Sequence, residues 1–264
     1  MESLRGKKCF IFDMDGTIYL GDGLIDGAKN LLEQLEEKGI LYIFLTNNSS
    51  KSRSNYQKKL KDFGIEVAED KIFTSGEATR IYIKSQGEKK NVFLLGNEDL
   101  TREFQEDGFI LEGNSSYDYV VLGFDTTLTY DKIWKACDLV KDGVEFLATH
   151  PDYVCPLAGG KTMPDTGAMI KMFEAASGRT PKVIGKPNKL IVESIMTKYD
   201  LDRDDIVMVG DRLYTDIKLG ENAGVDSILV LSGEARVEDL ADTEVKPTHV
   251  MESVKDLYSF LSNA

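Results

Sequence analysis

Two aspartates separated by a single residue, Asp13 and Asp15, follow a short apolar run near the start of the chain. Carboxylates at such a place could bind a hard cation, act as a nucleophile or exchange protons. In open α/β sheets ligands bind beyond the carboxyl ends of the strands, where this pair would lie. An EF-hand loop also begins D-x-D, but it needs glycine at its sixth position, where this chain has Ile18. A solvated acidic turn is the structural alternative for the pair taken alone.

Polar side chains also follow three other apolar runs. Residues 41–45 lead to Thr46 and Asn47, residues 183–185 lead to Lys186, and residues 206–209 lead to Asp211 and then Asp216. Each group alone is typical of a turn, a helix cap or a solvated lysine. Together, a hydroxyl, an amide, an ammonium and carboxylates at successive strand ends predict one polar site at this edge of a sheet.

Two glycine patterns could suggest a nucleotide-binding loop, and neither fits. The glycines at 21, 23 and 27 lack the G-x-G-x-x-G spacing and precede an expected helix at residues 29–38, which indicates turn chemistry. A P-loop ending at Gly160-Lys161-Thr162 would require a glycine where the chain has Cys155.

The chain resembles the haloacid dehalogenase (HAD) superfamily of phosphotransferases. The four motifs of that superfamily match DMDGT at 13–17, Thr46, Lys186 and GDRLYTD at 210–216. Within it, the chain is similar to the NagD and p-nitrophenyl phosphatase branch, through the segments IFDMDGTIY, TNNSSKSR, ATHPD and VIGKPN. The resemblance covers almost the whole chain, and its motifs specify the superfamily better than any substrate.

The resemblance implies a Mg²⁺-dependent phosphoric monoester hydrolase that forms an aspartyl-phosphate. Asp13 would attack phosphorus and, with Asp211 and the backbone carbonyl of Asp15, bind Mg²⁺. The Asp15 side chain would protonate the leaving oxygen and later accept a proton from water. Related ion-pumping ATPases carry threonine at that position, so a carboxylate there favours rapid turnover.

The remaining motif residues are expected to bind the phosphoryl group. Thr46 and Asn47 would donate hydrogen bonds to its oxygens, and Lys186 would add a fixed positive charge. Asp216 is expected to orient Lys186 or a metal-bound water. The expected partner is a small phosphorylated metabolite such as a sugar phosphate, a nucleoside monophosphate or phosphoglycolate, with p-nitrophenyl phosphate as a substrate in vitro.

Two other functions fit the same motifs. A phosphotransferase or mutase would pass the phosphoryl group from Asp13 to a sugar hydroxyl, and acceptor-dependent product formation would reveal it. A regulatory protein could keep the phosphate pocket without turnover, although the intact aspartates and lysine argue against this. A receiver domain fits less well because it lacks a large insertion.

The elements around these motifs alternate between strand and helix patterns, which predicts a doubly wound, Rossmann-like parallel sheet. The interval from Thr46 to Lys186 is too long for one crossover and contains its own apolar runs at 92–95, 119–122 and 146–148. We therefore predict a HAD-like core at 1–81 and 181–264, with an α/β cap domain inserted at 82–180.

The segment 148–169 is rich in proline and glycine and is the candidate cap loop facing the catalytic centre. It carries two candidate cap contacts, His150 and Asp152. His150 stands where asparagine is common in the family and could donate a hydrogen bond to a leaving group. A structurally bonded loop histidine is the alternative.

Composition limits the partners. The formal net charge of −13 argues against nucleic-acid polymers, whose binding depends on basic surface. The three cysteines lack metal-ligand or redox spacing. No signal segment and no apolar run of about 20 residues is evident, so we expect a cytoplasmic protein that does not bind membranes. The cap is a candidate surface for a homodimer.

Overall fold

The computed structural model describes residues 2–88, 90–112, 116–157 and 160–263. The chain divides into two compact units. The first unit comprises Met1–Thr46, Arg53–Phe73 and Pro187–Ala264, and the second comprises Asn47–Ser52 and Thr74–Lys186.

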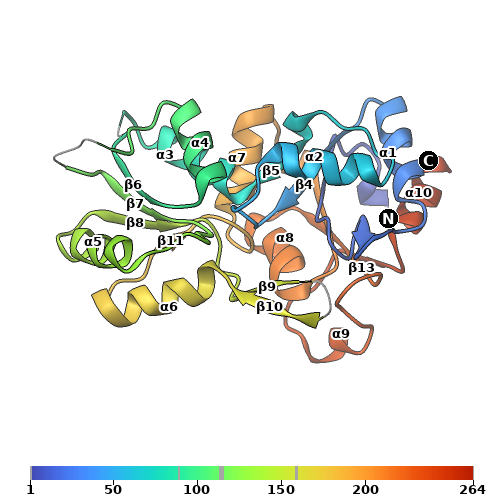
Figure 1. Cartoon of the computed structure of the whole chain (residues 1–264). Coiled ribbons are helices and arrows are strands. Elements are labelled where there is room, and N and C mark those ends of the chain that lie inside the picture. The colour runs from blue at the N-terminus through green and yellow to red at the C-terminus, as the bar shows by residue number, and fades with distance from the viewer. Residues whose placement is uncertain (1, 89, 113–115, 158–159, 264) are drawn as a thin grey trace. The chain divides into compact units, whose positions relative to one another are not determined.

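The first unit is built on a six-stranded sheet (Figure 1). From edge to edge its strands are β14 (His249–Met251), β13 (Asp226–Val230), β12 (Ile206–Gly210), β1 (Cys9–Phe12), β4 (Leu41–Thr46) and β5 (Ile72–Thr74). The pairings from β14 through β4 are parallel. All residues of β1 and β12 are buried, as expected for central strands covered on both faces.

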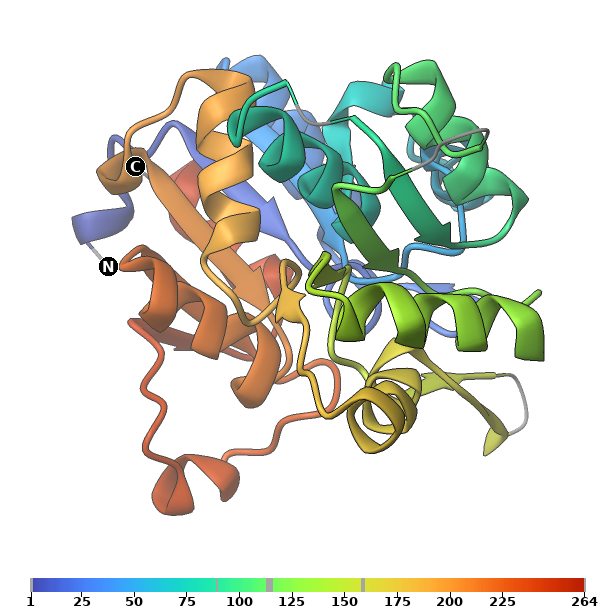
Figure 2. The same ribbon diagram turned by 90° about the vertical axis from the view of Figure 1, so that its left-hand side faces the viewer.

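Helices cover this sheet. They are α1 (Ala28–Glu37), α2 (Arg53–Asp62), α7 (Leu190–Tyr199), α8 (Lys218–Ala223) and α10 (Val254–Ser262). The short helix α9 (Asp239–Asp242) has no buried residue. Figure 2 shows α7 and α8 on the viewer's side of the sheet. Helices α1 and α10 pack together, and α1 begins after Gly27, which has a φ of 82°. A Cβ at Gly27 would lie 2.7 Å from the Cα of Lys255, so this close approach requires glycine.

A small antiparallel hairpin follows β1 and the D-x-D pair. It consists of β2 (Tyr19–Leu20) and β3 (Gly23–Leu24). The glycines that could have suggested a nucleotide loop therefore lie in a hairpin and at the start of α1, which confirms the interpretation as turn chemistry.

The second unit has its own parallel sheet, in the order β11 (Lys182–Val183), β8 (Glu145–Ala148), β7 (Tyr119–Leu122) and β6 (Val92–Leu95). Its helices are α3 (Ser75–Ser85), α4 (Glu98–Glu106), α5 (Tyr130–Lys141) and α6 (Thr166–Ser177). Helices α5 and α6 pack on each other, and the core between them and the sheet includes Leu122, Cys137 and Phe173. The chain thus has the predicted α/β class, and the segments of the second α/β unit are inserted between those of the first.

The limits of the units differ from the predicted cap boundaries of 82 and 180. The second unit includes all of α3, because the buried Arg80 of this helix bonds to Glu103 in α4 and to Asp107 just after it. It also includes the short segment 47–52, which the sequence had placed in the core.

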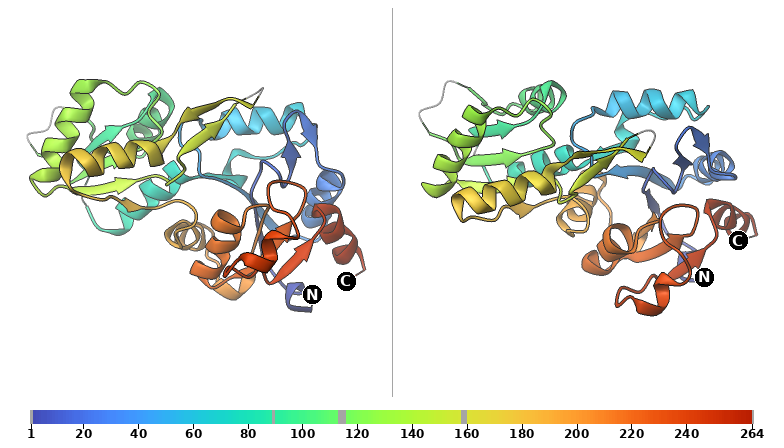
Figure 3. Two further views of the ribbon diagram at one scale, coloured as in Figure 1. Left: turned by 90° about the horizontal axis from the view of Figure 1, so that it is seen from below. Right: turned by 60° about the horizontal axis from the view of Figure 1, so that its bottom comes forward.

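The proline- and glycine-rich segment 148–169 is not simply a loop. It forms an antiparallel ribbon of β9 (Val154–Pro156) and β10 (Thr162–Pro164), which leads into α6 (Figure 3). The predicted segment includes residues 158–159, which lie outside the described residues.

Among the described residues, no helix combines the length and the apolar character that crossing a bilayer requires. The cysteines are free thiols. Cys9 and Cys137 are buried, and Cys155 is partly exposed.

Candidate active site

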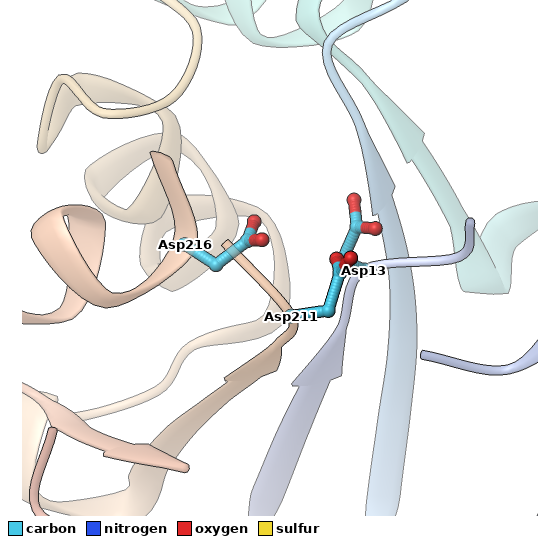
Figure 4. Close-up of side chains that lie close together, drawn as sticks. All are labelled: Asp13, Asp211 and Asp216. Atoms are coloured by element: carbon cyan, nitrogen blue, oxygen red, sulfur yellow. The ribbon is translucent and has the colours of Figure 1, made fainter. Parts of the chain in front are cut away.

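Three aspartates of the first unit converge: Asp13, Asp211 and Asp216 (Figure 4). One carboxylate oxygen from each lies within 4.8 Å of the others. Asp13 and Asp211 follow the neighbouring strands β1 and β12, and the Asp13 N–H donates to the carbonyl of Val209 at 2.8 Å. Asp216 lies on a single π-helical turn, Leu213–Ile217, that begins just after Asp211. Parallel pairing of two central strands therefore brings two carboxylates together, and the turn adds the third.

Glycines make room for these carboxylates. A Cβ at Gly16 would lie 2.3 Å from the Asp211 Oδ2, and a Cβ at Gly233 would lie 2.0 Å from the same atom. A Cβ at Gly210 would lie 2.3 Å from the Cβ of Asp216. Contacts that short are impossible, so larger residues at these positions would displace the carboxylates.

Backbone groups hold the same carboxylates in place. The N–H of Glu234 donates to the Asp211 Oδ2 at 2.7 Å, and the N–H of Arg212 donates to the Asp216 Oδ2 at 3.2 Å. The segment around Gly233 and Glu234 was missed by the sequence analysis. The sequence there is Ser-Gly-Glu, soon after β13, and these three residues do not form a recognisable motif.

The cluster fits a divalent metal ion. Asp211 and Asp216 are almost fully buried, at 2% and 0% exposed, and Asp13 is partly buried. Three negative charges this close repel one another strongly unless a cation or protons compensate them. Carboxylate oxygens are also the hard donors that Mg²⁺ and similar ions prefer. Both the spacing of the three carboxylates and the chemistry of their oxygen donors therefore suit a divalent metal ion.

Arg212 adds a positive charge beside the cluster. Although burial opposes its charged form, the carboxylates of Asp13 and Asp211 raise the pKa of Arg212. Its Nε lies 3.0 Å from the Glu234 Oε2, and the hydroxyl of Tyr214 donates to the other oxygen of that carboxylate at 2.7 Å. Arg212 belongs to the GDRLYTD motif, which by itself predicts no role for this residue.

Asp15 is placed differently from the three clustered aspartates. Its side chain is 62% exposed, and its carboxylate accepts a hydrogen bond from the Tyr19 hydroxyl at 3.3 Å. Lys59 lies 3.9 Å from the other oxygen and 3.8 Å from the centre of the Tyr19 ring. Burial and the Asp15 carboxylate raise the pKa of Tyr19 well above its usual range, so this hydroxyl stays a donor. The Asp15 side chain is thus directed to groups other than the carboxylate cluster.

The other predicted residues divide between the units. Thr46 is the last residue of β4, the strand beside β1 in the first unit. Asn47 and Lys186 belong to the second unit and bond to each other. The Asn47 Oδ1 accepts from the Lys186 N–H at 2.8 Å, and its Nδ2 donates to the Lys186 carbonyl at 3.0 Å and to the Asp152 carboxylate at 3.2 Å. The Asn47 amide donors therefore bond within the second unit in this structure, and the expected donation to a phosphoryl group stays a prediction.

His150 and Asp152 also have defined partners within the second unit. His150 is fully buried; its Nε2 bonds to the Asp165 Oδ1 at 2.9 Å and its Nδ1 to the Thr149 Oγ1 at 2.9 Å. With both ring nitrogens bonded to protein groups, this is the geometry of a structural histidine. Asp152 is partly exposed and accepts from Asn47.

Comparisons with known proteins agree with these features. Residues 10–110 match the haloacid dehalogenase-like hydrolase family, and residues 183–257 match the related HAD-hydrolase-like family. An acid sugar phosphatase from Staphylococcus aureus is 36% identical over 254 residues, which is 96% of each chain.

Solved structures give the same result. A 4-nitrophenylphosphatase from Thermotoga maritima is similar with a TM-score of 0.91 and 44% identity, over 97% of this chain and 98% of that one. NagD from E. coli K-12 is similar with a TM-score of 0.87 and 30% identity, over 95% and 98%. These proteins are of the branch that the sequence motifs indicated, and phosphatases of this superfamily generally use a divalent metal ion. The chain belongs to the haloacid dehalogenase-like hydrolases and is a phosphatase of their NagD and p-nitrophenyl phosphatase branch.

Proposed function

We propose that this phosphatase hydrolyses small phosphomonoesters with Mg²⁺ as its cofactor and an aspartyl-phosphate as intermediate. The observation that carries the proposal is the cluster of Asp13, Asp211 and Asp216, with oxygens within 4.8 Å of one another at the ends of β1 and β12. Asp13, Asp211 and the backbone carbonyl of Asp15 would hold the ion. Bound there, it would neutralise negative charge on the phosphoryl oxygens and so permit attack by an anion.

In the first displacement, an oxygen of Asp13 bonds to phosphorus while the bond from phosphorus to the ester oxygen breaks. The leaving oxygen takes a proton from Asp15. The exposed position of Asp15 and its contact with Tyr19 support this role, because the side chain is outside the carboxylate cluster. In the second displacement, water attacks phosphorus, Asp15 accepts its proton, and Asp13 is regenerated as phosphate departs.

Two residues would stabilise the negative charge on the transferring group. The Thr46 hydroxyl would donate a hydrogen bond to a phosphoryl oxygen, and the Lys186 ammonium would add positive charge. Asp216, in the same cluster as the ligands, would orient a metal-bound water or Lys186. These assignments rest on the match to the family's motifs.

The proposed substrates are sugar phosphates and other small phosphorylated metabolites. The names of the relatives, an acid sugar phosphatase and 4-nitrophenylphosphatases, support this class and an activity on p-nitrophenyl phosphate in vitro. A small ester also fits the net charge of −13, since a local cation rather than the overall field would attract it.

Phosphate release from p-nitrophenyl phosphate and a panel of sugar phosphates and nucleoside monophosphates tests the proposal. We expect turnover with Mg²⁺, its loss with EDTA, and at least a 10³-fold lower kcat in Asp13→Asn, since the nucleophile is removed. Rapid-quench detection of an acid-stable, hydroxylamine-sensitive phosphoprotein would show the intermediate. No turnover by folded, Mg²⁺-loaded protein would refute hydrolysis, and product formation only with a sugar acceptor would identify a transferase.

A further inference from the structure

The side chain of Asn47, which directly follows Thr46, bonds to the backbone of another motif residue, Lys186. Its amide pairs with both backbone groups of Lys186: the Oδ1 accepts from the N–H at 2.8 Å, and the Nδ2 donates to the carbonyl at 3.0 Å. We propose that Asn47 is a positioning residue, which fixes the backbone of Lys186 and thereby the place from which the lysine side chain reaches the phosphoryl group. The inference rests on the proposed function, because it requires Lys186 to act there.

Neighbouring residues leave room for the pairing of Asn47 with Lys186 and hold the backbone of Asn47. A Cβ at Gly185 would lie 2.6 Å from the Asn47 Oδ1 and 2.5 Å from the carbonyl oxygen of Thr149. Only glycine before the lysine therefore allows the amide to approach. The Ser75 hydroxyl donates to the Asn47 carbonyl, so the backbone of Asn47 is held as well.

The pair is also anchored to the rest of the second unit. The Asn47 Nδ2 lies 3.2 and 3.3 Å from the two oxygens of Asp152, and the carbonyl of Asp152 accepts from the N–H of Gly167 at the start of α6 at 2.7 Å. Asn47 is 6% and Lys186 4% exposed, so water competes little for these bonds. The amide thus links Lys186 to Asp152, which in turn bonds to the start of α6.

The position of the pair along the chain gives the link its importance. Asn47 is the first residue of the second unit after Thr46, and Lys186 is the last before Pro187. The hydrogen bonds therefore join two of the points at which the chain passes between the units. A backbone that is free to shift there would move the ammonium, and a misplacement of about 1 Å can cost on the order of 100-fold in rate.

A double-mutant cycle with Lys186→Met tests the inference. Asn47→Asp keeps the acceptor but replaces the donor, and it sets a second carboxylate against Asp152. In Asn47→Asp we expect kcat to fall about 10- to 100-fold. The relative sizes of the changes in kcat and in KM should match those in Lys186→Met. In the double variant we expect no loss beyond that of Lys186→Met alone, because the group that Asn47 positions is already absent.

The matched control is Asn48→Asp. The Asn48 Oδ1 accepts from the N–H and hydroxyl of Ser50 at 2.9 and 3.0 Å, and a carboxylate keeps both bonds while adding the same charge one residue away. We expect activity within about threefold of wild type. A change of that size is smaller than the effect of losing one typical hydrogen bond. Asn47→Ala, which adds no charge, replaces Asn47→Asp if circular dichroism shows that variant to be unfolded.

The outcomes separate this inference from the proposed function. If the fold-losses in kcat of the two single variants multiply in the double variant, the positioning role is overturned. The role of Lys186 itself would remain intact. Wild-type activity in Lys186→Met would overturn both the role of Lys186 and this inference, whereas the Asp13→Asn result would still test hydrolysis through Asp13.

Discussion

At the scale of single residues, the site depends on glycines that leave space as much as on the carboxylates that occupy it. Gly16, Gly210 and Gly233 leave the space that Asp211 and Asp216 occupy. The carboxylates could be found from the sequence because they carry chemistry and follow apolar runs. The need for Gly233 could not, because it arises only when its loop packs against a residue that is distant in the sequence.

Gly233→Ala tests this steric requirement. The added Cβ would lie 2.0 Å from the Asp211 Oδ2, so the carboxylate must move, and we expect Mg²⁺ affinity and kcat/KM to fall at least about 10-fold. Titration calorimetry with Mg²⁺ and steady-state kinetics measure the two effects. Gly23→Ala is the control, since its nearest neighbour would be a carbonyl at an ordinary 3.7 Å. Unchanged metal affinity in Gly233→Ala would contradict the requirement.

Cys9 gives a prediction for the pH dependence of stability. Burial in β1 raises the pKa of this thiol from 9.0 to about 12. Because the folded state keeps the proton that the unfolded chain loses, the stabilisation is complete below pH 9 and declines as pH rises towards 12. Between pH 9 and 10.5 we expect the free energy of unfolding of wild type to fall more steeply than that of Cys9→Ala, by up to about 1.4 kcal/mol per pH unit.

Urea unfolding at a series of pH values measures the difference in slope. The buried tyrosines titrate in both proteins, so their contribution cancels in the comparison. Equal slopes would mean that the Cys9 thiol titrates normally in the folded state. Ellman's reagent gives an independent check, since the partly exposed Cys155 should react before Cys9.

At the scale of elements, the sequence predicted best those strands that are short, continuous apolar runs. The runs at 92–95 and 119–122 coincide with β6 and β7. The strand before Lys186 is shorter than predicted, because Ile184 and Gly185 follow β11 rather than extend it. The ribbon of β9 and β10 was missed, since its residues are largely exposed and carry no apolar alternation.

Helix α3 shows why the unit boundary could not be read from the sequence. The helix carries the buried Arg80, whose partners Glu103 and Asp107 lie 23 and 27 residues further along the chain. A sequence pattern shows that a helix is amphipathic, but it does not show which sheet covers its buried face. For the same reason the amide of Asn47 suggested a donor, but its partner, 139 residues away, was hidden.

Arg80→Met tests the ion pairs that join α3 to α4. Burial opposes the charge on Arg80, but Glu103 and Asp107 raise its pKa and stabilise it. Removing the guanidinium leaves the Glu103 carboxylate, 11% exposed, without that partner, so we expect a loss of about 3–5 kcal/mol in the free energy of unfolding.

Lys84→Met is the matched control for this change. Lys84 also pairs with Asp107, at 2.7 Å, but its side chain is 46% exposed, and a loss below about 1 kcal/mol is expected. Chemical denaturation of both variants gives the comparison. Similar losses in the two would show that burial of the pair does not matter.

At the scale of the whole molecule, the metal should stabilise one unit. Asp13, Asp211 and Asp216 all lie in the first unit, so a bound ion relieves repulsion in that unit's folded state only. At 100 times its dissociation constant, Mg²⁺ should add about 2.7 kcal/mol to the free energy of unfolding. Scanning calorimetry with Mg²⁺ and with EDTA measures the shift. Asp211→Asn should lose most of the shift and, with one charge fewer in the cluster, be at least as stable as wild type in EDTA.

The division of the chain also determines where the second unit could be excised or exchanged. The second unit is not one insertion but two, because the segment 47–52 belongs to it together with 74–186. Within that unit the Ser49 hydroxyl bonds to Thr149 and accepts from the N–H of Phe124. An excision at residues 74 and 186 would therefore strand six residues without their partners. Exchange of this unit between related phosphatases, in evolution or by design, must carry the short segment with the long one.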